Sequence, residues 1–134
     1  YGVIKDPELF QIFSMLQPPF GVSLPGIEAA LSALEDGEFL EKTREYVQEA
    51  KAAMLDTMAK IKNLEVAATH PSTPIMMVHH RRGNLFEMLA HLGIDSEPGS
   101  GYLDLDDSTV RLRVPPPEEL ERAVDLISRL NERS

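Results

Sequence analysis

Hydrophobic and polar positions change their spacing along the chain, from a helical period in the first half to alternation in the second. From Glu38 to Ile61, apolar residues recur every three or four positions, which predicts a long amphipathic helix. Two shorter helical patterns precede it, one starting at Asp6 and the other at Ser23. We expect the first helix to carry its apolar residues inward, namely Leu9, Phe10, Ile12, Phe13 and Leu16. The second should carry Ile27, Ala30, Leu31 and Leu34 on one side.

The second half contains short segments rich in branched and apolar residues, which favour strands. Segments 64–68 and 75–79 flank a proline-rich turn, and segments 102–105 and 109–114 flank a polar turn that predicts a hairpin. Helical patterns start at Asn84 and at Pro117. The order predicts an α+β fold with N-terminal helices, one of them a long connecting helix, then a small, mostly antiparallel sheet with two covering helices.

Segment 109–114 carries the most informative chemistry. Its even-numbered residues are apolar and its odd-numbered residues are polar, so Arg111 and Arg113 share one face of the predicted strand. Guanidinium groups bind carboxylates and phosphates through paired hydrogen bonds, which makes both arginines candidate ligands for an acidic substrate group. The alternative is that they are solvated surface arginines that pair with nearby carboxylates.

Composition excludes several classes of function. The chain has 134 residues, a net charge of -9 and no cysteine, so we expect one domain that binds no nucleic acid and forms no disulfide. No apolar run approaches the roughly 20 residues of a membrane span, and we expect a cytoplasmic location and no membrane partner. The histidines at positions 70, 79, 80 and 91 lack the spacing of metal ligands, so we expect no metal site.

Three stretches resemble, in order, the C-terminal part of fold-type I pyridoxal-phosphate enzymes of the class I/II aminotransferase group. Within that group they are similar to histidinol-phosphate aminotransferases and threonine-phosphate decarboxylases. They are YGVIKDPELF at 1–10, PPFGVSLPGIEAALSALEDGEFL at 18–40, and LFEMLAHLGID followed by STVRLRVPPPEELERAV at 85–95 and 108–124. The stretch HPSTPIMMVHH at 70–80 departs from the family pattern. This departure leaves the substrate open, and also the choice between a transaminase and a decarboxylase or lyase.

The resemblance implies a division of the chain and a role for each part. Residues 1–37 would be the end of a large-domain strand with linker helices, and residues 38–134 the small C-terminal domain with its connecting helix. Arg111 would bind the α-carboxylate of an amino-acid or keto-acid substrate, with Arg113 as a supporting charge. The enzyme would be a homodimer that uses pyridoxal 5'-phosphate.

The same resemblance implies that the chemical half of the site lies outside this chain. The family's cofactor lysine and phosphate-binding arginine precede the point that matches Tyr1. We therefore expect no catalytic and no cofactor-binding residue here, and no activity from the chain alone. Lysines occur at 5, 42, 51, 60 and 62, and we expect the last four to lie on the polar side or at the end of the long helix.

The rival hypothesis, from another functional class, is a free-standing α+β module for interaction or ligand sensing. In that case the resemblance would be accidental, and the long amphipathic helix would serve as a dimer face.

Overall fold

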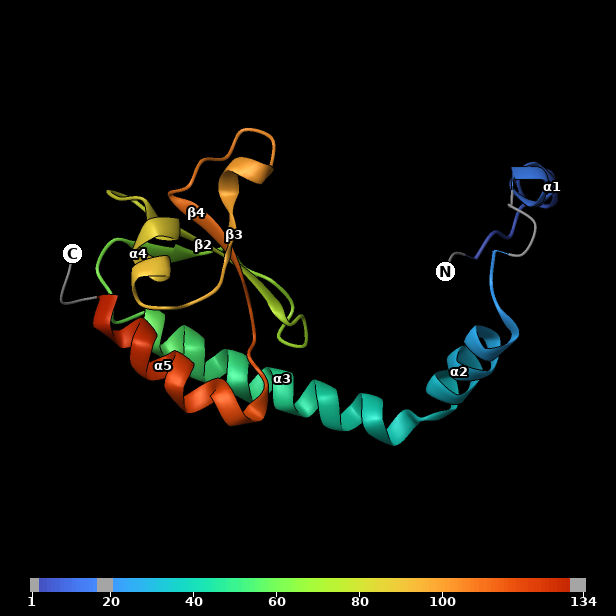
Figure 1. Ribbon diagram of the computed structural model, residues 1–134, viewed down its shortest axis with the longest axis horizontal. Coiled ribbons are helices and arrows are strands. Elements are labelled where there is room, and N and C mark those ends of the chain that lie inside the picture. Colours follow the sequence, from blue (N-terminus) through green and yellow to red (C-terminus); the bar gives the residue numbers. More distant parts are fainter. Residues whose placement is uncertain (1–2, 17–20, 131–134) are drawn as a thin grey trace. The chain divides into compact units, whose positions relative to one another are not determined.

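The computed structural model describes residues 3–16 and 21–130, and the chain divides into two compact units, Tyr1–Glu38 and Phe39–Ser134. The predicted α+β class is confirmed, with long and short helices followed by one sheet (Figure 1). The elements are α1 (Pro7–Leu16), α2 (Leu24–Glu35), α3 (Gly37–Met58), β1 (Leu64–Val66), β2 (Ile75–His80), α4 (Leu85–His91), β3 (Glu97–Pro98), β4 (Thr109–Arg113) and α5 (Leu120–Ser128).

The first unit consists of α1 and α2, whose predicted starts are confirmed. The Asp6 carboxylate accepts hydrogen bonds from the first-turn amides of α1, and the Ser23 hydroxyl accepts one from the Gly26 amide. The predicted inward orientation of the apolar side of α1 is wrong for this chain, and the apolar side of α2 is exposed as well. Phe10 is 59% exposed and Leu34 is 70% exposed, and neither helix has a buried residue. An apolar helix side needs a packed neighbour to be buried, and within this unit the two helices do not bury each other.

The second unit begins with most of α3, which ends at Met58, three residues before the predicted end at Ile61. Its 22 residues span about 33 Å at 1.5 Å per residue. A turn with Asn63 in the left-handed conformation, φ 66°, then leads into β1. The helical spacing of Val47, Ala50 and Met54 buries one side of α3 against the sheet.

The four strands are antiparallel to their neighbours and lie in the order β1-β2-β4-β3. The predicted hairpin is wrong in one detail, because β4 pairs with Glu97–Pro98 and not with residues 102–105. Backbone geometry explains the difference. Gly99 lies directly against the backbone carbonyls of Asp106 and Thr109, and Asp104 has a φ of 61°, so the intervening chain folds into a loop.

One face of the sheet is covered by helices, and α3 and α5 run side by side along it (Figure 1). A 3-10 turn, Pro117–Glu119, leads into α5 and satisfies the predicted proline start. In the described residues no helix is both long enough and apolar enough to cross a membrane. The buried core of this unit is formed by Val47, Ala50, Met54, Met58, Ile61, Met76, Val78, Leu85, Leu89, Val110, Leu112, Val114, Ile127 and Leu130.

Candidate functional site

The candidate site lies on the outward face of the sheet, opposite the covering helices. On β4, Val110 and Leu112 are buried while Arg111 and Arg113 are exposed, in agreement with the alternation of the sequence. Residues directly opposite each other on antiparallel strands share a face. The pairing places Met77 on one side of Arg111 and Glu97 on the other. A cation therefore stands between an apolar side chain and a carboxylate.

Arg111 forms an ion pair with Glu97 across the β3–β4 pairing. The contact joins Nη2 of the guanidinium to one carboxylate oxygen, and the two side chains are 43% and 46% exposed. Tyr102 lies beside this pair. Partial burial, followed by its hydrogen bond to Glu97, raises the pKa of the Tyr102 phenol. Because a guanidinium has five N–H donors in a planar fork, one contact with Glu97 leaves donors for a second carboxylate.

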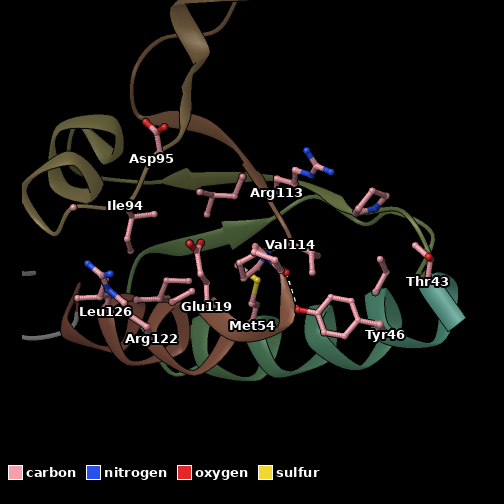
Figure 2. A pocket seen from close by; sticks show the side chains of 18 residues that line it. Thr43, Tyr46, Met54, Ile94, Asp95, Arg113, Val114, Glu119, Arg122 and Leu126 are labelled. Atoms are coloured by element: carbon pink, nitrogen blue, oxygen red, sulfur yellow. Dashed lines mark hydrogen bonds between the residues drawn. The ribbon is translucent and has the colours of Figure 1, made fainter.

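Arg113 lies two residues further along β4, opposite Ile75, and is exposed. Figure 2 shows its side chain directed away from α3 and α5, at the rim of a cavity beneath the sheet. Arg111 and Arg113 thus share the outward face. Of these two arginines, Arg111 is the one that forms the ion pair with Glu97.

A hydrogen-bonded group of side chains continues the outward face beyond Arg111. The His79 Nδ1 lies 3.1 Å from the Thr109 hydroxyl and 3.2 Å from the Ser108 hydroxyl, and Ser108 also bonds to Asp106. Hydrogen bonds from the Ser108 hydroxyl and then its backbone N–H hold the pKa of Asp106 below its usual value. Because Asp106 bonds to the serine and not to the histidine, the group lacks the order of a nucleophile–base–acid triad.

The group lines an open cavity of about 870 Å³ beside Arg111. Met77, the cross-strand neighbour of Arg111, forms part of the lining. Three carboxylates, on Glu65, Asp104 and Asp106, also line it. The lining of this cavity is therefore mostly apolar with carboxylates among its polar groups, and Arg111 itself is not part of it.

A second cavity, of about 720 Å³, lies between α3, α5 and β4 on the covered side of the sheet (Figure 2). Its lining is mostly apolar and includes Met54 and Ile127. The Tyr46 hydroxyl donates a 2.7 Å hydrogen bond to the Pro115 carbonyl, and burial, with Glu118 as a smaller cause, raises the pKa of Tyr46. The Tyr46 hydroxyl is thus engaged by the backbone, and the charged residues of this cavity are Asp95, Arg113, Glu119 and Arg122.

Lys51, the buried lysine among the described residues, does not offer a free amine to pyridoxal phosphate. A site for this cofactor needs a lysine amine that can form an imine with it. Lys51 was expected on the polar side of the long helix, but this is wrong, because it is only 3% exposed. Its ammonium donates to the Thr69 hydroxyl at 2.6 Å and to the carbonyls of His70 and Thr73 at 2.9 and 3.0 Å. All three N–H bonds have acceptors, so Lys51 holds the β1–β2 loop against α3.

The histidines lie apart in the fold. His79 points to the outward face, whereas His80 is 4% exposed on the covered face. In the part of the chain that the structure describes, no three His, Cys, Asp or Glu side chains come together as metal ligands.

Sequence reasoning missed two residues of this region, and for different reasons. Glu97 lies in a strand of only two residues, too short for alternation to reveal its face. Lys51, in contrast, occupies a position four residues after Val47 and three before Met54, in register with the apolar stripe of α3. That helical spacing was the available signal for its burial.

No family model matches the chain. The chain is 23% identical over 125 residues to "Histidinol-phosphate aminotransferase 2" of Archaeoglobus fulgidus, covering 92% of this chain and 35% of that protein. It is 28% identical over 125 residues to "Histidinol-phosphate aminotransferase" of Methanosarcina mazei, covering 92% of this chain and 33% of the relative. The chain therefore spans about a third of the length of these curated relatives.

Two crystal structures share the fold. Histidinol-phosphate aminotransferase from Clostridium acetobutylicum superposes with a TM-score of 0.81 and 16% identity, covering 95% of this chain and 39% of that one. L-threonine-O-3-phosphate decarboxylase from Porphyromonas gingivalis gives 0.70 and 16%, covering 92% and 38%. The predicted resemblance is confirmed: this chain resembles the C-terminal portion, about 35%, of histidinol-phosphate aminotransferase and threonine-phosphate decarboxylase-like fold-type I enzymes.

Proposed function

We propose that this chain is the small-domain part of a homodimeric, pyridoxal-phosphate-dependent aminotransferase-like enzyme that acts on an amino acid, and that Arg111 binds the substrate carboxylate. One observation carries the proposal. Arg111 stands on the face of the sheet opposite α3 and α5, with donors left after its contact with Glu97. The similarity to about a third of the length of an aminotransferase supports the proposal that the chain is one part of such an enzyme.

The exposed first unit supports the same proposal. Large apolar side chains such as Phe10, Phe13 and Leu34 are each more than half exposed, whereas the second unit has its own buried core. Large exposed apolar surfaces are typical of interfaces. We therefore infer that residues 1–37 pack against the cofactor-binding domain, and that the chain alone has no transaminase activity.

The type of reaction has two candidates. The fold is shared with an aminotransferase and with a decarboxylase. Analysis of products separates them, because transamination yields a keto acid and decarboxylation yields carbon dioxide. We favour transamination, since the curated relatives are aminotransferases.

The coding sequence before Tyr1 gives the first test. The proposal expects a lysine roughly a dozen residues upstream, followed by an arginine, as the resemblance implies. A start codon immediately before Tyr1 would contradict it and favour the free-standing module.

Arg111→Ala in the full-length polypeptide gives the second test. Removing one partner of a desolvated charge pair costs about 2 to 5 kcal/mol, so kcat/KM should fall roughly 30- to 4,000-fold, because each 1.4 kcal/mol is tenfold. The cofactor absorbance should not change. Arg81→Ala is a matched control, since Arg81 also pairs with a glutamate, Glu65, at the surface of the same sheet. Unchanged kinetics in Arg111→Ala would return Arg111 to the role of a solvated surface arginine.

A further inference from the structure

The helix α1 is apolar around most of its circumference. Its ten residues include six large apolar side chains, each at least half exposed, namely Leu9, Phe10, Ile12, Phe13, Met15 and Leu16. At about 100° per residue, these positions cover an arc of about 220°, with Met15 at one end and Phe10 at the other. The charged residue of α1, Glu8, falls at one side of this arc in the first turn. A surface helix typically has an apolar stripe of about 100°, so α1 has more apolar surface than one flat neighbour can cover.

The next helix, α2, has the ordinary arrangement. Its four large apolar side chains fall within about 80° of the circumference, namely Leu24, Ile27, Leu31 and Leu34. One packed surface covers such a stripe. Both helices belong to the same unit and neither has a buried residue, so they differ in the spacing of their apolar residues and not in their exposure. Where α2 needs one covering surface, α1 needs two.

The segment that contains both helices is almost free of charge. Residues 7–34 include two charged side chains, Glu8 and Glu28, whereas 26% of the whole chain is charged and its net charge is -9. Two copies of an acidic protein repel each other where their charged surfaces meet. Charged residues are depleted in the core of protein interfaces, and obligate dimer interfaces are especially hydrophobic. The composition of this segment therefore suits contact with a second copy of the protein.

We propose that α1 is a subunit-interface helix, which packs with one side of its apolar arc on the cofactor-binding domain of its own polypeptide and with the other side on a second copy of the protein. This role rests on the proposed function, because it requires both a cofactor-binding domain and a second subunit. In a symmetric dimer both subunits contribute α1, so a substitution in this helix alters the interface twice.

The experiment maps the two ends of the arc in the full-length, cofactor-loaded enzyme. The photo-reactive amino acid p-benzoyl-L-phenylalanine replaces Phe10 in one variant and Met15 in another, and retained activity shows that each variant is folded. After irradiation, we expect one position to form a covalent dimer on a denaturing gel. The other should form a crosslink within the subunit, to a peptide that precedes Tyr1. The same amino acid at Glu121, on the exposed side of α5, is the control and should form neither product.

Sedimentation velocity of Phe10→Ala and Met15→Ala provides a second measurement. The alanine at the position that crosslinks between subunits should raise the dissociation constant of the dimer at least about tenfold, because it truncates a buried interface side chain in both subunits. The alanine at the other position acts within the subunit and should change this constant less. Leu103→Ala removes an exposed leucine of the second unit and should leave the constant within about threefold of wild type.

The remaining outcomes contradict this role of α1. Crosslinks within the subunit from both positions would overturn it, because one domain would then enclose the helix. Covalent dimers from both positions, or from neither, would overturn it as well. A wild-type enzyme that is active as a monomer would also overturn it, while the proposed reaction would stand. A full-length protein that reacts with no amino acid would count against the proposed function itself, whichever crosslinks form.

Discussion

The buried ammonium of Lys51 provides a prediction about how the second unit is held together. Lys51→Met removes the charge and keeps a side chain of similar length. Hydrogen bonds to a charged group are each worth about 1.5 to 3 kcal/mol. Three such bonds join Lys51 to Thr69, His70 and Thr73. Taking the ammonium out of water costs several kcal/mol and offsets part of their sum.

The net change in the free energy of unfolding depends on which of the three acceptors water cannot reach after the substitution. Thr69 and His70 are exposed, so water can replace the lysine at both, whereas Thr73 is only partly exposed. We therefore expect Lys51→Met to lower the free energy of unfolding by about 2 kcal/mol, near the cost of one unsatisfied carbonyl plus lost charge-assisted bonds.

Urea denaturation followed by circular dichroism measures this change. The midpoint should move to lower urea at an unchanged slope, because the unfolded surface is the same. Lys60→Met, at an exposed position after the end of α3, is the control and should stay within about 0.5 kcal/mol of wild type. A Lys51→Met protein as stable as wild type would show that the three bonds do not exceed the cost of burying the charge, and would contradict the prediction.

Two further predictions concern the sheet. Burial, with the neighbouring His79 as a smaller cause, lowers the pKa of His80 below 6.5. The unfolded chain then binds the proton more tightly, so stability should decrease as the pH falls from about 6.5 toward the folded pKa. His80→Phe should weaken this dependence in urea titrations at pH 7.5 and 5.5, and an undiminished dependence would assign the acid sensitivity elsewhere. Gly99→Ala would place a methyl group on the backbone carbonyls of Asp106 and Thr109, so thermal unfolding should show a loss of at least about 2 kcal/mol. Gly101→Ala, where the methyl group meets nothing within 4 Å, should change stability little, and equal effects of the two would rule out the steric explanation.

Periodicity was sufficient to predict the elements whose environment is uniform along their length. Alternation in residues 109–114 identified the buried and exposed faces of β4, and helical spacing identified α3 and α5. The short β3 and the loop after it could not be found in this way. Their path depends on a contact between Gly99 and distant carbonyls, which leaves no period in the sequence.

The apolar sides of α1 and α2 show a different limit. Their spacing correctly predicts amphipathic helices, but burial depends on a surface that these residues do not supply to each other. The candidate site likewise depends on a partner that the local sequence pattern does not reveal. Alternation placed Arg111 outward, whereas its partner Glu97 became visible only through the register of β3 on β4.

The role of Arg111 is tested most directly by a cycle of two enzymes and two substrates. The full-length wild-type enzyme and its Arg111→Ala variant are each assayed with the amino acid that reacts fastest and with the amide of that amino acid, which lacks the carboxylate. We expect wild type to prefer the acid over the amide by at least tenfold in kcat/KM, and Arg111→Ala to reduce this ratio to about one. A variant that keeps the wild-type ratio would contradict the account, because some other group would then bind the carboxylate.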